Sequence, residues 1–199
     1  MKAISILKLI ICVLLLPVSL AGTSALLDGL HKINDAGQAF FWSGVFGFFV
    51  VDLVICRLSG IYKKGQRLVE VVFGFLSPLL KVAPYLFPVW TIAVLLSFLS
   101  VRLFVDIPMV RDAFLFLSGF SLVLHLVYSV SGLRARGDDF LRAGYFFLVS
   151  FVYPISIFIL AVALSCLSAE FSLGEFCRFW CIFTRRIYSV VLGQLFINP

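Results

Sequence analysis

The sequence is poor in charged residues, and this shortage excludes an ordinary soluble fold. Only 13% of its 199 residues are charged, whereas 62% are hydrophobic. A soluble domain carries roughly a quarter charged residues. Because so few charges cannot cover a water-exposed surface, lipid must be most of the solvent of this chain. We therefore expect one all-α integral membrane domain over residues 1–199.

Histidine is also scarce, with only His31 and His125 in the chain. No HExxH motif is present, so the zinc site of a standard membrane metalloprotease is missing. The GxSxG, Walker A and GxGxxG motifs are absent as well. The five cysteines form no CxxC pair. We expect no catalytic residue, no metal site and no cofactor.

Long apolar segments predict a polytopic transmembrane helix bundle. The predicted spans, about five in number, are residues 9–27, 39–56, 82–101, 113–133 and 143–167. The polar stretches Asp28–Gln38 and Arg102–Asp112 are expected to be loops between spans. Gly44 and Gly47 lie close to one face of the second span, which favours a close helix approach there.

Three segments leave alternatives open. Residues 1–21 also fit a cleaved signal peptide, although the apolar run continues to Leu27 and favours an uncleaved helix. Residues 66–80 are too short to span and predict a half-helix that is re-entrant or interfacial. Residues 172–197 predict an amphipathic helix lying on the membrane. A sixth span from about Phe171 would hold two arginines, which makes it the costlier alternative.

The net charge of +6 is not a signal for nucleic acid, because Lys and Arg collect on the cytoplasmic side of membrane proteins. With five spans and a cytoplasmic N-terminus, the basic residues before the tail fall into two unequal groups. The cytoplasmic group is Lys2, Lys8, Arg57, Lys63, Lys64, Arg67, Lys81, Arg134, Arg136 and Arg142, and the outer group is Lys32, Arg102 and Arg111. The sequence thus predicts a multi-pass protein of the cell membrane whose partner is the lipid bilayer and which binds no nucleic acid.

Two ionisable residues are expected within spans. Asp52, near the cytoplasmic end of the second span, fits a polar cavity or proton path, or an interfacial carboxylate that reaches water or pairs with Arg57. His125, in the middle of the fourth span, fits a metal ligand or proton relay, or an imidazole hydrogen-bonded to Ser121, Ser129 or a backbone carbonyl. A small transporter or channel-like protein that uses Asp52 and His125 is therefore one functional hypothesis.

Polar residues also open the segment that follows the second span. Gln66 and Glu70 are four residues apart and share a helix face, and Arg67 can pair with Glu70. One carboxylate and one amide do not make a zinc site, which needs about three good ligands. The spacing alone favours a solvated polar first turn at the membrane surface.

Taken in order, several blocks of the chain resemble a small branch of the site-2 protease family, the membrane-embedded zinc metalloproteases. The blocks are Phe40–Val51 (FFWSGVFGFFVV), Gly65–Glu70, Ala83–Pro88 (APYLFP), Ser121–Ser131 with His125, and Asp138–Asp139. In the family, the position of Gly65–Glu70 reads Gly-His-Glu-x-x-His, and that of Ala83–Pro88 reads Ala-Pro-Tyr-Phe-Phe-Pro. The resemblance covers most of Phe40–Leu164.

The same resemblance implies that activity is lost. It puts Gln66 and Glu70 where the two zinc-binding histidines belong, and Arg67 where the catalytic Glu belongs. Arg67 cannot act as the general base for zinc-bound water. Only Phe75–Val82 stands where the family has a Gly-rich, strand-like segment. The resemblance therefore implies a degenerate, non-catalytic homologue, not an enzyme, that binds transmembrane segments of other membrane proteins or serves as a scaffold.

Overall fold

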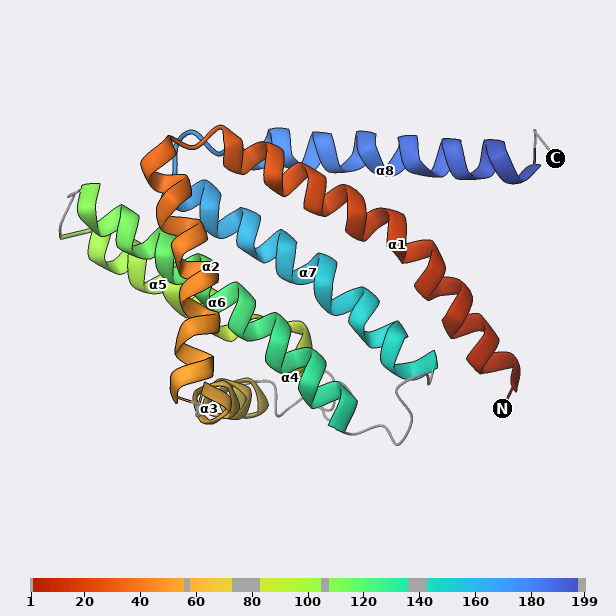
Figure 1. Cartoon of the computed structure of the whole chain (residues 1–199), viewed down its shortest axis with the longest axis horizontal. Helices are drawn as coiled ribbons and strands as arrows, with labels where there is room; N and C mark the ends of the chain where they lie inside the picture. Colours follow the sequence, from red (N-terminus) through yellow and green to blue (C-terminus); the bar gives the residue numbers. More distant parts are fainter. Residues whose placement is uncertain (1, 56–57, 73–82, 105–107, 136–142, 197–199) are drawn as a thin grey trace.

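Every regular element of the described residues is a helix, so the predicted all-α class is confirmed (Figure 1). The computed structural model describes residues 2–55, 58–72, 83–104, 108–135 and 143–196. The helices are α1 (Lys2–His31), α2 (Asp35–Ile55), α3 (Leu58–Val72), α4 (Ala83–Leu86), α5 (Val89–Arg102), α6 (Pro108–Ala135), α7 (Ala143–Leu167) and α8 (Leu173–Phe196).

Four of the described helices are long and apolar enough to cross a membrane. The apolar segments are Ile6–His31 in α1, Asp35–Val54 in α2, Met109–Gly132 in α6 and Val149–Leu167 in α7. They coincide with four of the predicted spans. The chain therefore has the helices of a multi-pass membrane protein.

The predicted span 82–101, which runs through Pro84 and Pro88, is divided into two helices in its described part. Helix α4 ends at Leu86 and α5 begins at Val89. Pro88 causes the break because proline has no N–H to donate and disfavours the helical conformation of the residue before it, Phe87. Helix α5 has 14 residues, so it is about 21 Å long, which is short of the roughly 30 Å hydrocarbon core.

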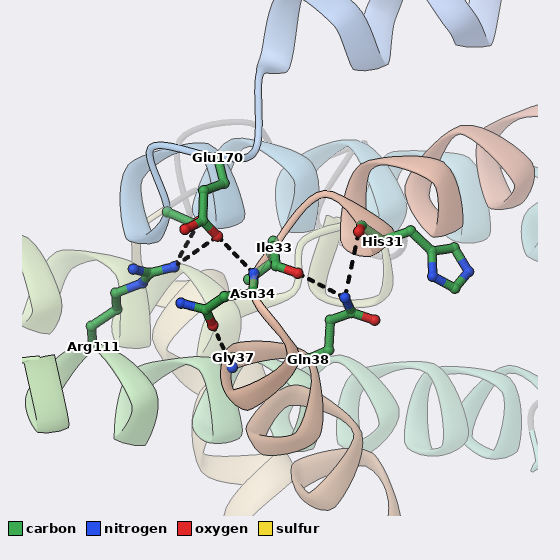
Figure 2. Close-up of polar contacts among 8 residues, drawn as sticks. His31, Ile33, Asn34, Gly37, Gln38, Arg111 and Glu170 are labelled. Carbon is green, nitrogen blue, oxygen red and sulfur yellow. Dashed lines mark hydrogen bonds and ion pairs between the residues drawn. The ribbon is translucent and has the colours of Figure 1, made fainter.

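The predicted loop Asp28–Gln38 is mostly helical, because α1 continues to His31 and α2 begins at Asp35. Polar side chains close both helix ends and make a long loop unnecessary (Figure 2). Asn34 Oδ1 accepts a hydrogen bond from the Gly37 N–H at 2.8 Å, which is an N-cap for α2. Gln38 Nε2 donates to the Ile33 carbonyl at 2.7 Å.

Residues from later in the chain complete this turn. Glu170, between α7 and α8, accepts a hydrogen bond from the Asn34 N–H at 2.7 Å (Figure 2). It also forms an ion pair with Arg111 of α6 at 3.4 Å. Lys32 Nζ lies 2.8 Å from Glu175 of α8, and this hydrogen bond raises the pKa of Lys32 above its usual value. The ends of α1 and α7 and the starts of α2, α6 and α8 therefore meet at one end of the bundle.

The predicted loop Arg102–Asp112 is also shorter than expected, because α6 begins at Pro108. Proline is favoured at the first position of a helix, where its missing N–H leaves no hydrogen bond unmade. Residues 105–107 of this predicted loop lie outside the described residues.

The charged segment before the predicted half-helix 66–80 belongs to the same helix, α3, which starts at Leu58. Residues 73–80 of the prediction lie outside the described residues. The inward face of α3 carries Leu58, Tyr62, Gly65 and Val69, and the outward face carries Lys63, Lys64 and Arg67. Because α3 has one buried and one basic face, it is amphipathic over its whole described length.

The C-terminal prediction of a helix over 172–197 agrees closely with α8. Helix α8 lies across the end of the bundle opposite α3 (Figure 1), and it packs mainly on α1. Arg178, Arg185 and Arg186 interrupt its apolar residues, and α8 is not among the helices apolar enough to cross.

The two helices in closest contact are α2 and α6. A Cβ atom added at Gly44 would lie 2.0 Å from the carbonyl oxygen of Phe116, and one added at Gly119 would lie 2.3 Å from that of Phe41. Real Cβ atoms do not approach so closely, so only glycine permits this backbone contact. The expected close approach at Gly44 is confirmed.

Replacing Gly44 by alanine should separate α2 from α6 and destabilise the fold by about 1–3 kcal/mol, as overpacking does. Gly60→Ala is the matched control, because no atom lies within 4 Å of the added Cβ. This control should leave stability unchanged or raise it by up to about 1 kcal/mol, since alanine favours helix more than glycine. Unfolding of each purified variant in mixed micelles measures its stability. Equal stabilities of the Gly44→Ala and Gly60→Ala variants would contradict the close contact.

Candidate functional site

Tyr62 of α3 is the centre of a buried polar cluster that includes one of the sequence-predicted residues, Gln66. The Tyr62 hydroxyl lies 2.8 Å from Ser129 Oγ of α6. Gln66 Nε2 donates to the same hydroxyl at 3.2 Å, so the proton of Tyr62 remains available for Ser129. Burial raises the pKa of Tyr62 to about 12. The phenol therefore stays protonated at neutral pH and acts as a hydrogen-bond donor.

His125 belongs to the same cluster and is only 2% exposed. Its ring nitrogens lie 3.4 Å from Ser129 Oγ, one turn further along α6. The Ser129 hydroxyl also donates to the Tyr85 carbonyl at 3.4 Å, which ties α6 to α4. The ring of Tyr62 lies beside the imidazole, tilted by 49°, with 6.2 Å between the ring centroids. Of the two serines expected near His125, the described contact is thus with Ser129.

Gln66 and His125 line one narrow recess. Tyr62, Gly65, Phe87, Val89 and Trp90 also line it among the described residues, and the space has no room for a water molecule. A Cβ atom at Gly65 would lie 2.8 Å from Trp90 Nε1, so the indole packs directly against the backbone of α3. The recess is therefore a tightly packed part of the core rather than an open binding pocket.

Asp52, the other predicted intramembrane residue, has a separate partner. Its carboxylate accepts a hydrogen bond from the Tyr128 hydroxyl. The ring of Tyr128 stacks on that of Tyr62, with 5.6 Å between centroids and 25° between planes. Asp52 and His125 are thus connected through two stacked phenol rings. The alternative partner Arg57 lies outside the described residues.

Of the two remaining predicted site residues, the structure describes the side chain of one. Arg67 is exposed on the outward face of α3. Glu70 lies on α3 as well, but its side chain is outside the described residues. Sequence reasoning missed Tyr62 and Tyr128. The available signal for Tyr62 was its position four residues before Gln66, which places both on one helix face.

The residues at the motif positions do not fit a zinc ion. Among the described residues, no group of three or more His, Cys, Asp and Glu side chains is close enough to hold a metal. Gln66 offers an amide rather than an imidazole, and Arg67 carries a positive charge that would repel a cation. Structural and catalytic zinc sites use at least three protein ligands of the Cys, His or carboxylate type.

Comparison of the chain with protein-family models, with curated proteins and with solved structures found no match. The resemblance to site-2 proteases therefore remains a prediction from the sequence blocks.

The purified chain should hold well below one zinc ion per molecule, and a chelator should leave its thermal unfolding unchanged. Elemental analysis measures the zinc content, and a melting curve measures the thermal unfolding with and without chelator. Stoichiometric zinc in the unaltered chain would contradict this prediction. The double variant Gln66→His/Glu70→His is the informative comparison, because it adds two imidazoles four residues apart on one face of α3, and Gln66 lies beside His125. Zinc content close to one in this variant is the result expected if the family geometry persists.

Proposed function

We propose that this chain is a non-catalytic membrane protein, related to the site-2 proteases but without their zinc site, that binds transmembrane segments of other membrane proteins. The observation that carries this proposal is the buried polar cluster around Tyr62. Gln66 at a motif position is hydrogen-bonded inward, in a space without room for water. A hydrolytic site needs both a water molecule and a substrate beside its reactive groups, and this arrangement supplies neither.

The same cluster argues against the transporter hypothesis. A transport path needs polar groups around a water-filled cavity or a continuous proton relay. Asp52 is bonded to Tyr128, and His125 lies beside Ser129 in a recess without room for water. The stacked rings of Tyr62 and Tyr128 lie between the two residues, and these internal partners support a structural role for both and favour the binding hypothesis.

One exposed face of α2 supplies a surface for a transmembrane partner. Helix α2 makes most of its contacts with α6, so its opposite side is uncovered in the described structure. Trp42, Phe46, Phe49 and Val50 lie at helical spacing on that side, and Phe46 is 65% exposed. Apolar stripes at this spacing are how helices dock along one another. This face, the α2 stripe, is our proposed contact surface.

The charges support an orientation of the chain in the cell membrane. The end of the bundle that holds α3 carries Lys63, Lys64 and Arg67. With the three arginines of α8 left aside, the end at the α1–α2 turn carries the bases Lys32 and Arg111 against the acids Asp35, Glu170 and Glu175. We propose that the α3 end and the N-terminus are cytoplasmic, because Lys and Arg concentrate there. In this orientation α5 crosses as a short fifth span, and α3 and α8 lie at opposite membrane surfaces.

A photoreactive amino acid at Phe49 should form adducts of discrete mass with other membrane proteins in native membranes. Phe48 is the matched control, because it is the neighbouring residue and is only 1% exposed. A second control at Leu20 of α1 samples an exposed position away from the stripe. Gel electrophoresis after irradiation separates protein adducts from lipid adducts. The same protein adducts at Phe49 and Leu20 would contradict the proposal that the α2 stripe is a specific partner surface.

The orientation can be measured by thiol labelling in intact cells. The background is Cys181→Ser, which removes an exposed thiol on α8. In this background, Lys32→Cys should react with a membrane-impermeant maleimide, and Lys63→Cys should react only after the membrane is permeabilised. The opposite result would invert the proposed topology, whereas labelling of both positions in intact cells would exclude it.

A further inference from the structure

Helix α8 is fixed to α1 by side-chain hydrogen bonds to backbone carbonyls. Trp180 Nε1 donates to the Val18 carbonyl at 2.8 Å, and the Tyr188 hydroxyl donates to the Leu14 carbonyl. The Trp180 ring also packs on Gly22, where an added Cβ would lie 2.9 Å from it. These contacts keep the two helices together over much of α1 and make Trp180 a rigid wall between them.

A groove of about 520 Å³ opens between the two helices and these contacts. It is lined by Val18, Trp180, Cys181, Thr184, Arg185 and Tyr188, and we call it the α1/α8 groove. Its lining is mostly apolar. Its volume lies within the range of roughly 300–1,000 Å³ that is typical of ligand sites. Helix α1 is long and apolar enough to span, whereas α8 is not, so the groove between them lies where the hydrocarbon meets the membrane surface.

Arg185 places a positive charge at the edge of this apolar groove. The ion pairs among the described residues involve Lys32 and Arg111, and none of them includes an arginine of α8. A guanidinium beside lipid is costly unless an anion accompanies it. Its planar fork of N–H donors matches a phosphate group better than an ammonium would.

We propose that the α1/α8 groove is a binding site for an anionic phospholipid. One acyl chain lies along Val18, Trp180 and Thr184, and Arg185 binds the phosphate. A transmembrane peptide would fill the apolar part but leave Arg185 without a counter-ion, whereas a phospholipid supplies an apolar chain and an anion in one molecule. This inference does not depend on the function proposed for the α2 stripe.

Quenching of Trp180 fluorescence by lipids with brominated acyl chains tests the site in the full chain, purified in detergent. All variants carry Trp42→Phe, because Trp42 is also exposed. Brominated phosphatidylglycerol should quench at a concentration about tenfold lower than brominated phosphatidylcholine, as expected for one hydrogen-bonded charge pair. Arg185→Gln should remove this difference. Arg178→Gln is the matched control, because it removes the same charge from α8 at a residue outside the groove, and it should retain the difference.

Two further measurements distinguish the contribution of the apolar groove to lipid binding from that of the Arg185 charge. Thr184→Phe fills the groove but keeps Arg185, and it should abolish the preferential quenching while far-UV circular dichroism stays unchanged. Millimolar inorganic phosphate should not compete, because it lacks the acyl chain. The proposal is overturned by equal binding of the two lipids, by equal loss in the two arginine variants, or by competition from phosphate alone. If the chain forms a dimer in which neither lipid quenches Trp180, the proposal is also overturned, and the groove is then assigned to a second copy of the chain.

Discussion

The close backbone contact between α2 and α6 determines where the polar residues of this protein lie. Gly44 and Gly119 let each helix approach a carbonyl group of the other. Further along the same pair of helices, this approach brings Asp52 within reach of Tyr128. The ring of Tyr128 in turn supports Tyr62 of α3. A bulkier residue at either glycine would therefore disturb the polar cluster as well as the packing of the bundle.

The cluster around Tyr62 illustrates how polar groups are accommodated where lipid is the solvent. An unpaired polar group costs several kcal/mol in hydrocarbon, so each needs a partner inside the protein. Ser129 serves three neighbours, since its hydroxyl contacts Tyr62, His125 and the Tyr85 carbonyl. Such a shared network holds α3, α4 and α6 together. It makes the motif region a structural junction rather than a reactive site.

The sequence predicts the apolar helices well and their ends poorly. Residues 143–167 coincide with α7, because a uniform apolar run lies between charged segments. The loop predicted at Asp28–Gln38 is largely helical, because its polar residues cap the helices in contacts that composition does not reveal. The prolines of the span 82–101 predict a broken helix, but hydropathy does not locate the break, which lies between Leu86 and Val89.

The partners within the site were beyond sequence reasoning for a different reason. Tyr62 and Ser129 are 67 residues apart, and Asp52 and Tyr128 are 76 apart. No local period connects such pairs, so Asp52 was recognised without its partner Tyr128, and Tyr62 was missed. Ser129 was expected only as a partner of His125, which lies four residues before it. The resemblance to site-2 proteases singled out Gln66 and His125 in separate blocks, and the fold places both beside one recess.

The contact between Asn34 and Glu170 also bears on how the chain is made. The two residues are 136 positions apart. A ribosome that has just released α1 and α2 has not yet made the carboxylate that their turn requires. The Asn34 N–H therefore lacks this partner until the segment after α7 has been made, so the contact that completes the α1–α2 turn forms late.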